Sequence, residues 1–231
     1  MPKCPVALDI ETVGQDWKSL SPKVRAYLTE RVKSTAKRKQ VPKRLGLHPA
    51  TGRIITIAMW DTEADQGHVL LEGRSREWHD MDTDIKAFCG SEKRLLNEFW
   101  RFVKDKASTI ITFNGRGFDA PYLMLRSAIL GIEPTRNLVP YRYSFQEHCD
   151  LMEVLSFWNA RFGEGTLDFW CRQFGIQSPK GKFDGSEIDA EYRKGKLEKI
   201  ARYCVGDARA TARLYLRLTP IIRLVGRDAK S

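Results

Sequence analysis

The 231-residue sequence has few cysteines, and none stands in a CxxC pair or at a Cys/His spacing typical of a zinc site. Their number is odd, so we expect reduced, mostly structural thiols at Cys4, Cys89, Cys149, Cys171 and Cys204. The N-terminal residues lack the basic and apolar regions of a signal peptide, and no apolar run approaches the roughly 20 residues of a membrane span. These absences predict a cytoplasmic protein without a membrane partner.

Linkers rich in proline, glycine or serine are also absent, as are internal repeats. Together with a hydrophobic content of 42%, this predicts a single domain over residues 1–231. Acidic residues are fewer than basic ones, and the formal net charge is +10. Such a charge favours a polyanionic partner, because phosphate backbones bind basic proteins largely through sequence-independent electrostatics. Charge alone is also compatible with a basic protein that has no such partner.

Five β-rich runs and several amphipathic segments predict the fold class. The runs lie at residues 6–14, 53–61, 67–73, 108–115 and 148–157. Helices are predicted from residue 21 onward and at 91–105, 119–131, 167–175 and 196–218. Three strands are thus followed by strands that alternate with helices, an order typical of an α/β three-layer fold. We expect a mixed five-stranded sheet flanked by helices, with the first strand inside it.

Two acidic residues interrupt the first β-rich run, VALDIETVG. Side chains alternate along a strand, so Asp9 and Glu11 share one face while Val6, Leu8 and Ile10 fill the other. Buried carboxylates without a partner are costly, which predicts a cation between them. The alternative is an edge strand with one solvated face.

Asp119 lies in TFNGRGFDAPYL, where a strand runs through a glycine-bearing loop into a helix. Asp is a favoured N-cap residue, so helix capping is one interpretation. Ligands also gather in loops after the carboxyl ends of strands in α/β sheets. Asn114 and Phe118 would then provide a polar anchor and an apolar contact in the same loop.

Asp207 interrupts the apolar stripe of the last helix, one turn after Tyr203. The phenol and the carboxylate therefore point the same way, and Gly206 between them permits a close backbone approach. A Tyr–Asp hydrogen bond that satisfies two half-buried groups is the structural alternative. If the sheet brings all four carboxylates together, oxygen ligands without Cys or His favour Mg²⁺ or Mn²⁺. Paired ions roughly 3.5 to 4 Å apart are typical of phosphoryl transfer.

The segments LDIET, FNGRGFD and YCVGD resemble, in this order, the three signature motifs of the DEDD 3′→5′ exonuclease superfamily in its tyrosine subclass. The fuller forms resemble the exonuclease domain of family B DNA polymerases and its free-standing bacterial relatives. The resemblance implies a ribonuclease H-like fold and a two-metal hydrolysis that releases nucleoside monophosphates from a 3′ end. It implies metal binding by Asp9, Glu11, Asp119 and Asp207.

The same resemblance implies that Tyr203 orients the attacking water. Asn114 and Phe118 match substrate-side positions of the second motif. In the GKFDGSEI stretch, Lys182 either contacts a phosphate or stays in solvent. The chain carries no polymerase palm or fingers motifs, so any polymerase or repair partner would act in trans.

A basic, helical insertion is expected at about residues 15–50, between the first two strands. Residues 33–44 within it carry six Lys or Arg and no acid. Lys37, Arg38 and Lys39 are candidates for contacts with a nucleic-acid backbone near the catalytic end of the first strand. A solvated surface loop is the alternative, because blocks of like charge often serve only as tails.

The favoured function is a metal-dependent 3′→5′ exonuclease acting on single-stranded DNA, with aromatic side chains stacking on terminal bases. An exoribonuclease with the same site is the first alternative, because discrimination depends on how 2′-hydroxyls are met. An inactive nucleic-acid-binding module is the second. The presence of all four acids and the tyrosine argues against that module.

Overall fold

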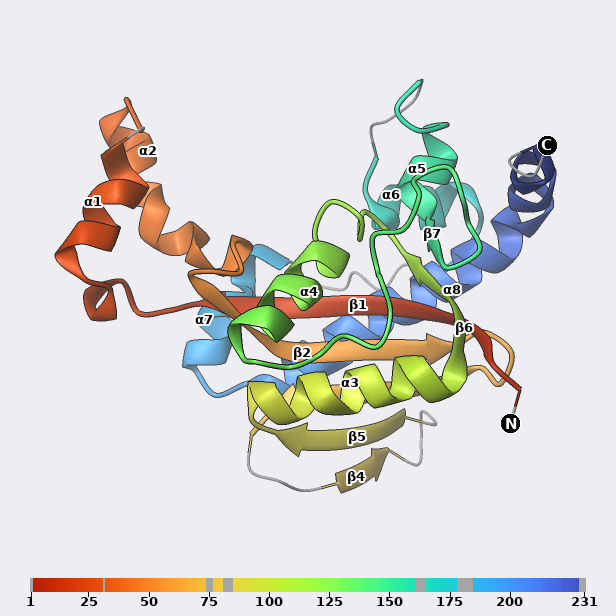
Figure 1. The fold of residues 1–231 in the computed structure, drawn as a ribbon, viewed down its shortest axis with the longest axis horizontal. Coiled ribbons are helices and arrows are strands. Elements are labelled where there is room, and N and C mark those ends of the chain that lie inside the picture. The colour runs from red at the N-terminus through yellow and green to blue at the C-terminus, as the bar shows by residue number, and fades with distance from the viewer. Residues whose placement is uncertain are drawn as a thin grey trace.

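The computed structural model describes residues 2–30, 32–73, 77–80, 85–160, 165–177 and 185–228. Its centre is a mixed sheet of seven strands in the order β4-β5-β3-β2-β1-β6-β7 (Figure 1). The strands are β1 (Cys4–Gly14), β2 (Gly52–Asp61), β3 (Gln66–Glu72), β4 (Glu77–Asp80), β5 (Ile85–Gly90), β6 (Ala107–Thr112) and β7 (His148–Asp150). β1, β2 and β3 form the antiparallel meander expected from the sequence. β6 then pairs in parallel with β1, which places β1 inside the sheet as predicted.

The α/β fold class is confirmed, but the expected count of five strands is wrong. The two additional strands, β4 and β5, extend the sheet beyond β3. β5 is only six residues long, and β4 only four. Runs this short depend on pairing with a neighbouring strand more than on their own β-propensity. Ile85, Ala87 and Cys89 are buried in the structure, and this alternation depends on the pairing of β5 with β3.

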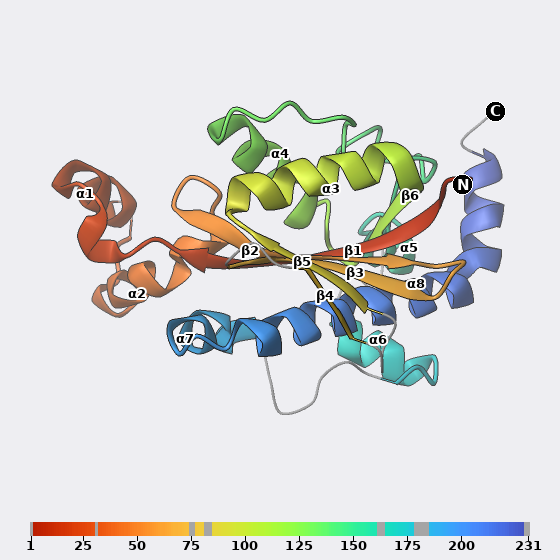
Figure 2. The ribbon, with the colours of Figure 1, turned by 90° about the horizontal axis from the view of Figure 1, so that it is seen from below.

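Helices cover both faces of the sheet, as Figure 2 shows. α3 (Glu92–Lys106) and α4 (Asp119–Ile129) lie on one face, and α6 (Leu167–Gln173), α7 (Ile188–Arg193) and α8 (Leu197–Asp228) lie on the other. The apolar stripe predicted for α3 is buried as expected, through Leu95, Leu96, Phe99, Trp100 and Val103. A short helix, α5 (Leu151–Leu155), follows β7. None of the described helices combines the length and apolarity needed to cross a membrane.

The alternation along β1 is also as predicted. Val6, Leu8 and Ile10 pack in the hydrophobic core under α3 and α4. Ala7 points to the opposite face and packs with residues of α8. Asp9 and Glu11, two and four residues further on, therefore face α8.

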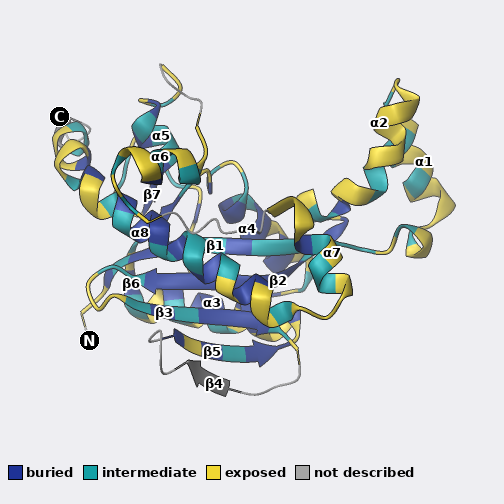
Figure 3. Ribbon diagram, turned by 180° about the vertical axis from the view of Figure 1, so that it is seen from behind, coloured by how far each residue is buried: buried dark blue, intermediate teal, exposed yellow. Residues whose placement is uncertain are grey.

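An arm of helices leaves the body between β1 and β2. It comprises the 3₁₀ turn η1 (Trp17–Ser19), α1 (Pro22–Glu30), α2 (Thr35–Gln40) and the 3₁₀ segment η2 (Val41–Leu47). α1 and α2 contain no buried residue, and Figure 3 shows both helices mainly exposed while the central strands are buried. The arm therefore adds surface rather than core.

Candidate active site

Asp9 and Glu11 lie on a strand that is paired on both sides, so the edge-strand alternative is wrong. Burial raises the pKa of both carboxyl groups well above the usual range. The negative charges of Asp207 and Asp119 raise both pKa values further. Because a neighbouring charge changes a pKa only over a short distance, these raised pKa values indicate that the four carboxyl groups lie close together.

Asp119 is the first residue of α4, and Phe118 occupies the N-cap position. The Asp119 Oδ1 atom accepts a hydrogen bond from the backbone N–H of Ile10 on β1, at 3.1 Å. The helix-capping alternative for Asp119 is therefore wrong: its carboxylate joins α4 to the strand that carries Asp9 and Glu11. Burial is the main cause that raises the pKa of Asp119 to about 7, and the charges of Asp150 and Asp207 contribute.

α8 contributes Tyr203 and Asp207 to the same place. Between them, the Cys204 thiol donates to the backbone carbonyl of Asp9 at 3.4 Å, which holds α8 against β1. The pKa of Tyr203 is raised by burial, then by the charges of Asp207, Glu11 and Asp9. The Tyr203 hydroxyl also donates a hydrogen bond to the Asp207 carboxylate. The Tyr203–Asp207 hydrogen bond expected from the structural alternative is thus formed. It lies close to the carboxylates of Glu11 and Asp9.

The structure therefore brings the five residues of the predicted catalytic set together from β1, α4 and α8. Within the described part of the chain, the buried Oδ2 atom of Asp9 has no hydrogen-bond partner. No three His, Cys, Asp or Glu side chains among the described residues already form a metal-binding group. The donor set still fits a hard divalent cation, because it consists of oxygen atoms whose mutual repulsion such an ion would offset.

Asn114 and Phe118 lie on the loop that joins β6 to α4. Asn114 has a left-handed backbone, with φ of 64°. A Cβ atom at Gly117 would lie only 2.8 Å from the Asn114 side-chain oxygen, so a larger residue there would displace the Asn114 side chain. The Phe118 ring packs on Tyr122 with 5.3 Å between centroids. Both candidates are thus held in the loop that leads directly into Asp119.

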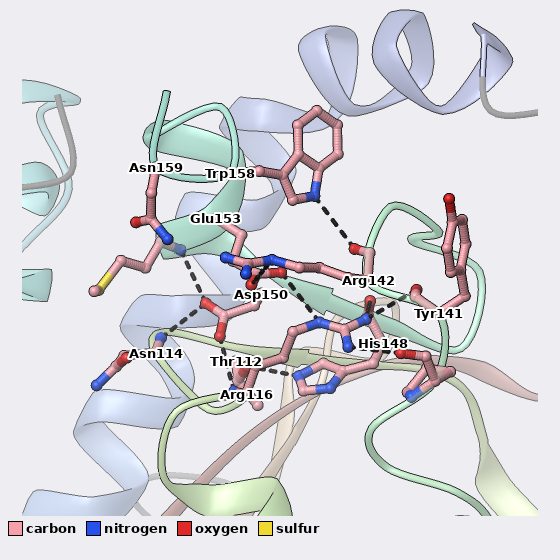
Figure 4. A network of polar contacts seen from close by, with 12 residues as sticks. Thr112, Asn114, Arg116, Tyr141, Arg142, His148, Asp150, Glu153, Trp158 and Asn159 are labelled. Atoms are coloured by element: carbon pink, nitrogen blue, oxygen red, sulfur yellow. Dashed lines mark hydrogen bonds and ion pairs between the residues drawn. The ribbon is translucent and has the colours of Figure 1, made fainter. Parts of the chain in front are cut away.

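Asp150, which the sequence analysis did not single out, organises this loop. Its carboxylate accepts the backbone N–H groups of Asn114 at 2.8 Å, Arg116 at 2.9 Å and Met152 at 3.0 Å (Figure 4). The last of these contacts makes Asp150 the N-cap of α5. An Asp directly before an apolar helical run is a recognisable N-cap signal. Its two contacts with a loop 34 to 36 residues earlier have no such signal.

Two arginines meet at Glu153 beside that loop. The Glu153 carboxylate lies 3.1 Å from Arg116 and 2.9 Å from Arg142. The Arg116 side chain is only 8% exposed and also donates to the carbonyls of Pro140 and Tyr141. Arg116 therefore links the loop of the second motif to the chain segment around residue 141.

His148 contacts the same segment through its ring. Its ring lies 2.7 Å from the Leu138 carbonyl and 2.8 Å from the Thr112 hydroxyl. Burial is the main cause that lowers the pKa of His148 to about 4. The neutral ring therefore donates to Leu138 and accepts from Thr112 near neutral pH.

Of two cavities in the described part of the structure, only one is lined by a candidate site residue. One, of about 380 Å³, is lined by Asn114, Arg116, Arg142, Asp150, Glu153 and Asn159, among others. A larger one, of about 610 Å³, lies between β3, β5 and α3 on the face of the sheet opposite Asp9. None of the described candidate residues lines the larger cavity, whereas Asn114 lines the smaller one, which therefore lies beside the second-motif loop.

Lys37, Arg38 and Lys39 lie on α2 and are exposed. The arm is anchored next to the carboxylates, because Thr12 and Tyr122 both donate to the Gly46 carbonyl, at 2.8 and 2.9 Å. Thr12 directly follows Glu11. Lys182 lies outside the described residues. Gly185, where the described chain resumes, is close to the site, since a Cβ atom there would lie 3.8 Å from the Tyr203 hydroxyl.

The family described as "Predicted 3'-5' exonuclease related to the exonuclease domain of PolB" matches residues 47–226. The chain belongs to this family. Asn114, Phe118, Asp119, Tyr203 and Asp207 lie within the matched range, whereas β1 and all of the arm except its last residue, Leu47, precede it. The predicted resemblance to the PolB-type exonucleases is thereby confirmed, and the chain carries a PolB-like 3′–5′ exonuclease domain.

Curated relatives of this exonuclease-family chain are DNA polymerases. The polymerase of Desulfurococcus sp. (strain Tok) is 29% identical over 197 residues, covering 77% of this chain and 24% of the relative. The polymerase of Thermococcus sp. (strain 9oN-7) is 30% identical over 198 residues, with the same two coverages. The chain therefore spans about a quarter of the length of these relatives.

Solved structures give the same result for the fold. The family B DNA polymerase of Pyrobaculum calidifontis superposes with a TM-score of 0.61 and 21% identity. The match covers 95% of this chain and 25% of the polymerase chain. The architecture is thus consistent with the ribonuclease H-like fold expected from the motifs.

Proposed function

We propose that this protein is a metal-dependent 3′→5′ exonuclease that removes nucleoside monophosphates from single-stranded DNA ends. The observation that carries the proposal is the convergence of four carboxylates from β1, α4 and α8, where burial and neighbouring negative charges raise the pKa values of Asp9, Glu11 and Asp119. A desolvated group of like charges is costly in a protein without a compensating cation. The exonuclease family to which the chain belongs supports the reaction class.

Asp9, Glu11, Asp119 and Asp207 would hold two divalent ions, Mg²⁺ or Mn²⁺. When bound, such ions lower the pKa of a water and offset charge on the leaving 3′ oxygen. In this proposal the Tyr203 hydroxyl orients the attacking water, which places the chain in the tyrosine subclass. Asn114, whose backbone N–H donates to Asp150, and Phe118, whose ring packs on Tyr122, would position the terminal nucleotide. Lys182 remains a predicted phosphate contact.

The two alternatives of the sequence analysis differ from this proposal in substrate and in turnover. An exoribonuclease would use the same carboxylates, and only contacts with the 2′-hydroxyl would separate the two activities. An inactive module would bind nucleic acid without cleaving it. One assay distinguishes all three.

We expect 5′-labelled single-stranded DNA to give a ladder of steadily shorter products with Mg²⁺ or Mn²⁺ and none with EDTA. Matched duplex DNA and RNA serve as competing substrates in the same assay. Immediate release of labelled mononucleotide would indicate the opposite polarity. Faster shortening of RNA would favour the exoribonuclease, and retained binding without products in Mn²⁺ would favour the inactive module.

We further propose that the arm contacts the nucleic-acid backbone through α2. Replacing Lys37, Arg38 and Lys39 by Ala should weaken binding to all sequences and flatten its salt dependence. The expected change in slope is about 0.7 per lost phosphate contact on a single strand. Fluorescence anisotropy with a labelled oligonucleotide over a range of salt concentrations measures it.

The matched control removes the same charge from elsewhere, as Lys3, Lys93 and Lys104 to Ala. These three lysines are exposed, and Lys93 and Lys104 lie on α3. An identical change of slope in both triple variants would show a general charge effect. An unchanged slope in the α2 variant would favour the solvated-surface alternative.

A further inference from the structure

Four aromatic rings form a continuous series on the surface beside the smaller cavity. Tyr141 lies 5.7 Å from Tyr143, and Tyr143 lies 5.3 Å from Trp158, measured between ring centroids. Trp158 in turn stacks on Phe145 at 5.3 Å with an interplanar angle of 5°. Tyr141 is 71% exposed and Tyr143 47%. We call these four residues the aromatic series.

The backbone that carries Trp158 adopts a conformation that ordinary residues avoid. Phe157, Trp158 and Asn159 are consecutive non-glycine residues in the left-handed region, with φ of 48°, 56° and 66°. Strain of this kind persists where surrounding contacts hold it, and it concentrates at functional sites. Here the contacts are the Trp158 amide to the Glu153 carbonyl at 2.8 Å and the Asn159 amide to the Ser156 hydroxyl at 3.1 Å.

The segment that carries Tyr141 and Tyr143 is also held in place, by a hydrogen bond and an ion pair of Arg142. The Trp158 indole N–H donates to the Arg142 carbonyl at 3.2 Å, and the Arg142 guanidinium pairs with Glu153 (Figure 4). Arg142 stands between Tyr141 and Tyr143 in the sequence, so its two contacts fix the segment that presents both rings. A surface whose rings are already in place binds a ligand without a large ordering cost.

The series is continuous with the loop of the second motif. Asn114, Arg142 and Asn159 all line the 380 Å³ cavity. In Figure 4, Trp158 lies above the polar network around Asp150 and Arg116, with Tyr141 to the right of this network and Asn114 to its left. The cavity thus joins the proposed terminal-nucleotide position at Asn114 to Arg142, which lies between Tyr141 and Tyr143 of the aromatic series.

We propose that the aromatic series is a stacking platform for bases of a single-stranded nucleic acid upstream of its 3′ end. This inference rests on the proposed exonuclease function, and it adds the surface that would distinguish a single strand from a duplex. Exposed aromatic faces stack on any base, and stacking requires bases that are not already paired. A net charge of +10 favours a nucleic acid over a protein partner for such a surface.

The test replaces Tyr141 and Tyr143 together by Ala, because both rings are exposed and their loss should leave the core intact. Binding is measured by anisotropy in EDTA with single strands of about 4 to 16 nucleotides, a range typical of stacking sites. For the longer strands we expect affinity to fall by about 5- to 150-fold per lost stack. Affinity for duplex DNA of the same length should stay within about twofold of wild type.

Phe169→Ala is the matched control, since Phe169 is 46% exposed and lies on α6, outside the aromatic series. A second readout is hydrolysis of the p-nitrophenyl ester of thymidine 5′-monophosphate, which has no upstream base and should proceed at the wild-type rate in the double variant. Unchanged binding of long single strands would overturn the stacking platform and leave a protein partner as the occupant of this surface. Absence of ester hydrolysis in the wild type would instead contradict the exonuclease proposal. The binding measurements in EDTA do not require nuclease activity, so they test the stacking platform separately.

Discussion

Asp9→Asn should lose most of its nuclease activity and keep its fold. The substitution removes one ligand charge while the side-chain volume stays the same, and we expect turnover to fall by more than about 100-fold, the upper range for merely supporting residues of metal sites. The fold should persist because the buried Asp9 Oδ2 atom has no hydrogen-bond partner to lose in the described structure. The substitution also relieves repulsion, because the negative charges of Glu11, Asp207 and Asp119 all raise the pKa of Asp9.

The melting temperature in EDTA and the single-turnover rate in Mg²⁺ or Mn²⁺ measure the two effects separately. In EDTA the Asp9→Asn variant should melt at or above the wild-type temperature. Added Mn²⁺ should stabilise the wild type more than the variant, because a ligand that binds the folded state raises its stability. Asp105→Asn, at an exposed position on α3, controls for the loss of one negative charge. Near wild-type turnover in Asp9→Asn would contradict the metal-site assignment.

Tyr203→Phe and Asp207→Asn should separate two residues that share a helix face and a hydrogen bond. Asp207→Asn should weaken metal binding and nearly abolish turnover. Tyr203→Phe should leave metal binding near wild type and lower turnover, because it removes one hydrogen bond to a reacting group. Such a bond contributes on the order of 1 to 3 kcal/mol, or about 5- to 150-fold in rate.

The structural alternative makes a different prediction for the same variants. The Tyr203 hydroxyl bonds to Asp207, so a purely structural role would lower stability and leave the rate of the folded enzyme unchanged. Melting temperature, metal titration and single-turnover rate of both variants decide between the two roles. If Tyr203→Phe melts early and still cleaves at the wild-type rate, the water-orienting role is wrong.

The sequence predicted most accurately those features that repeat every two residues along a strand or every 3.6 residues along a helix. Alternation in VALDIETVG correctly placed Asp9 and Glu11 on the face opposite Leu8, and the 3.6-residue period correctly aligned Tyr203 with Asp207. These predictions succeeded because side-chain direction within one strand or helix depends only on that element's own geometry. The motif order added the family, which the match over residues 47–226 confirms.

The alternatives for individual residues were decided only by contacts between distant elements. Capping by Asp119 was plausible until the Ile10 amide, 109 residues earlier, proved to be its partner. The partners of Asp150 and the pairing of β5 with β3 belong to the same class. Nothing in a local pattern encodes which distant backbone group a carboxylate or a short strand will meet, because that depends on how the whole sheet assembles.

The sequence by itself determined the identities of the acids, the tyrosine and the glycine-bearing loop, together with the faces on which they lie. Only the tertiary structure decided that α8 lies against β1 through Cys204, that Tyr143 and Trp158 are in contact, and that Asn114 and Arg142 line one cavity. The series illustrates the reason, since Tyr143 and Trp158 are 15 residues apart and show no periodic relation. Their contact depends on a left-handed turn at Phe157–Asn159, which local hydrogen bonds and the Trp158–Arg142 hydrogen bond hold in place.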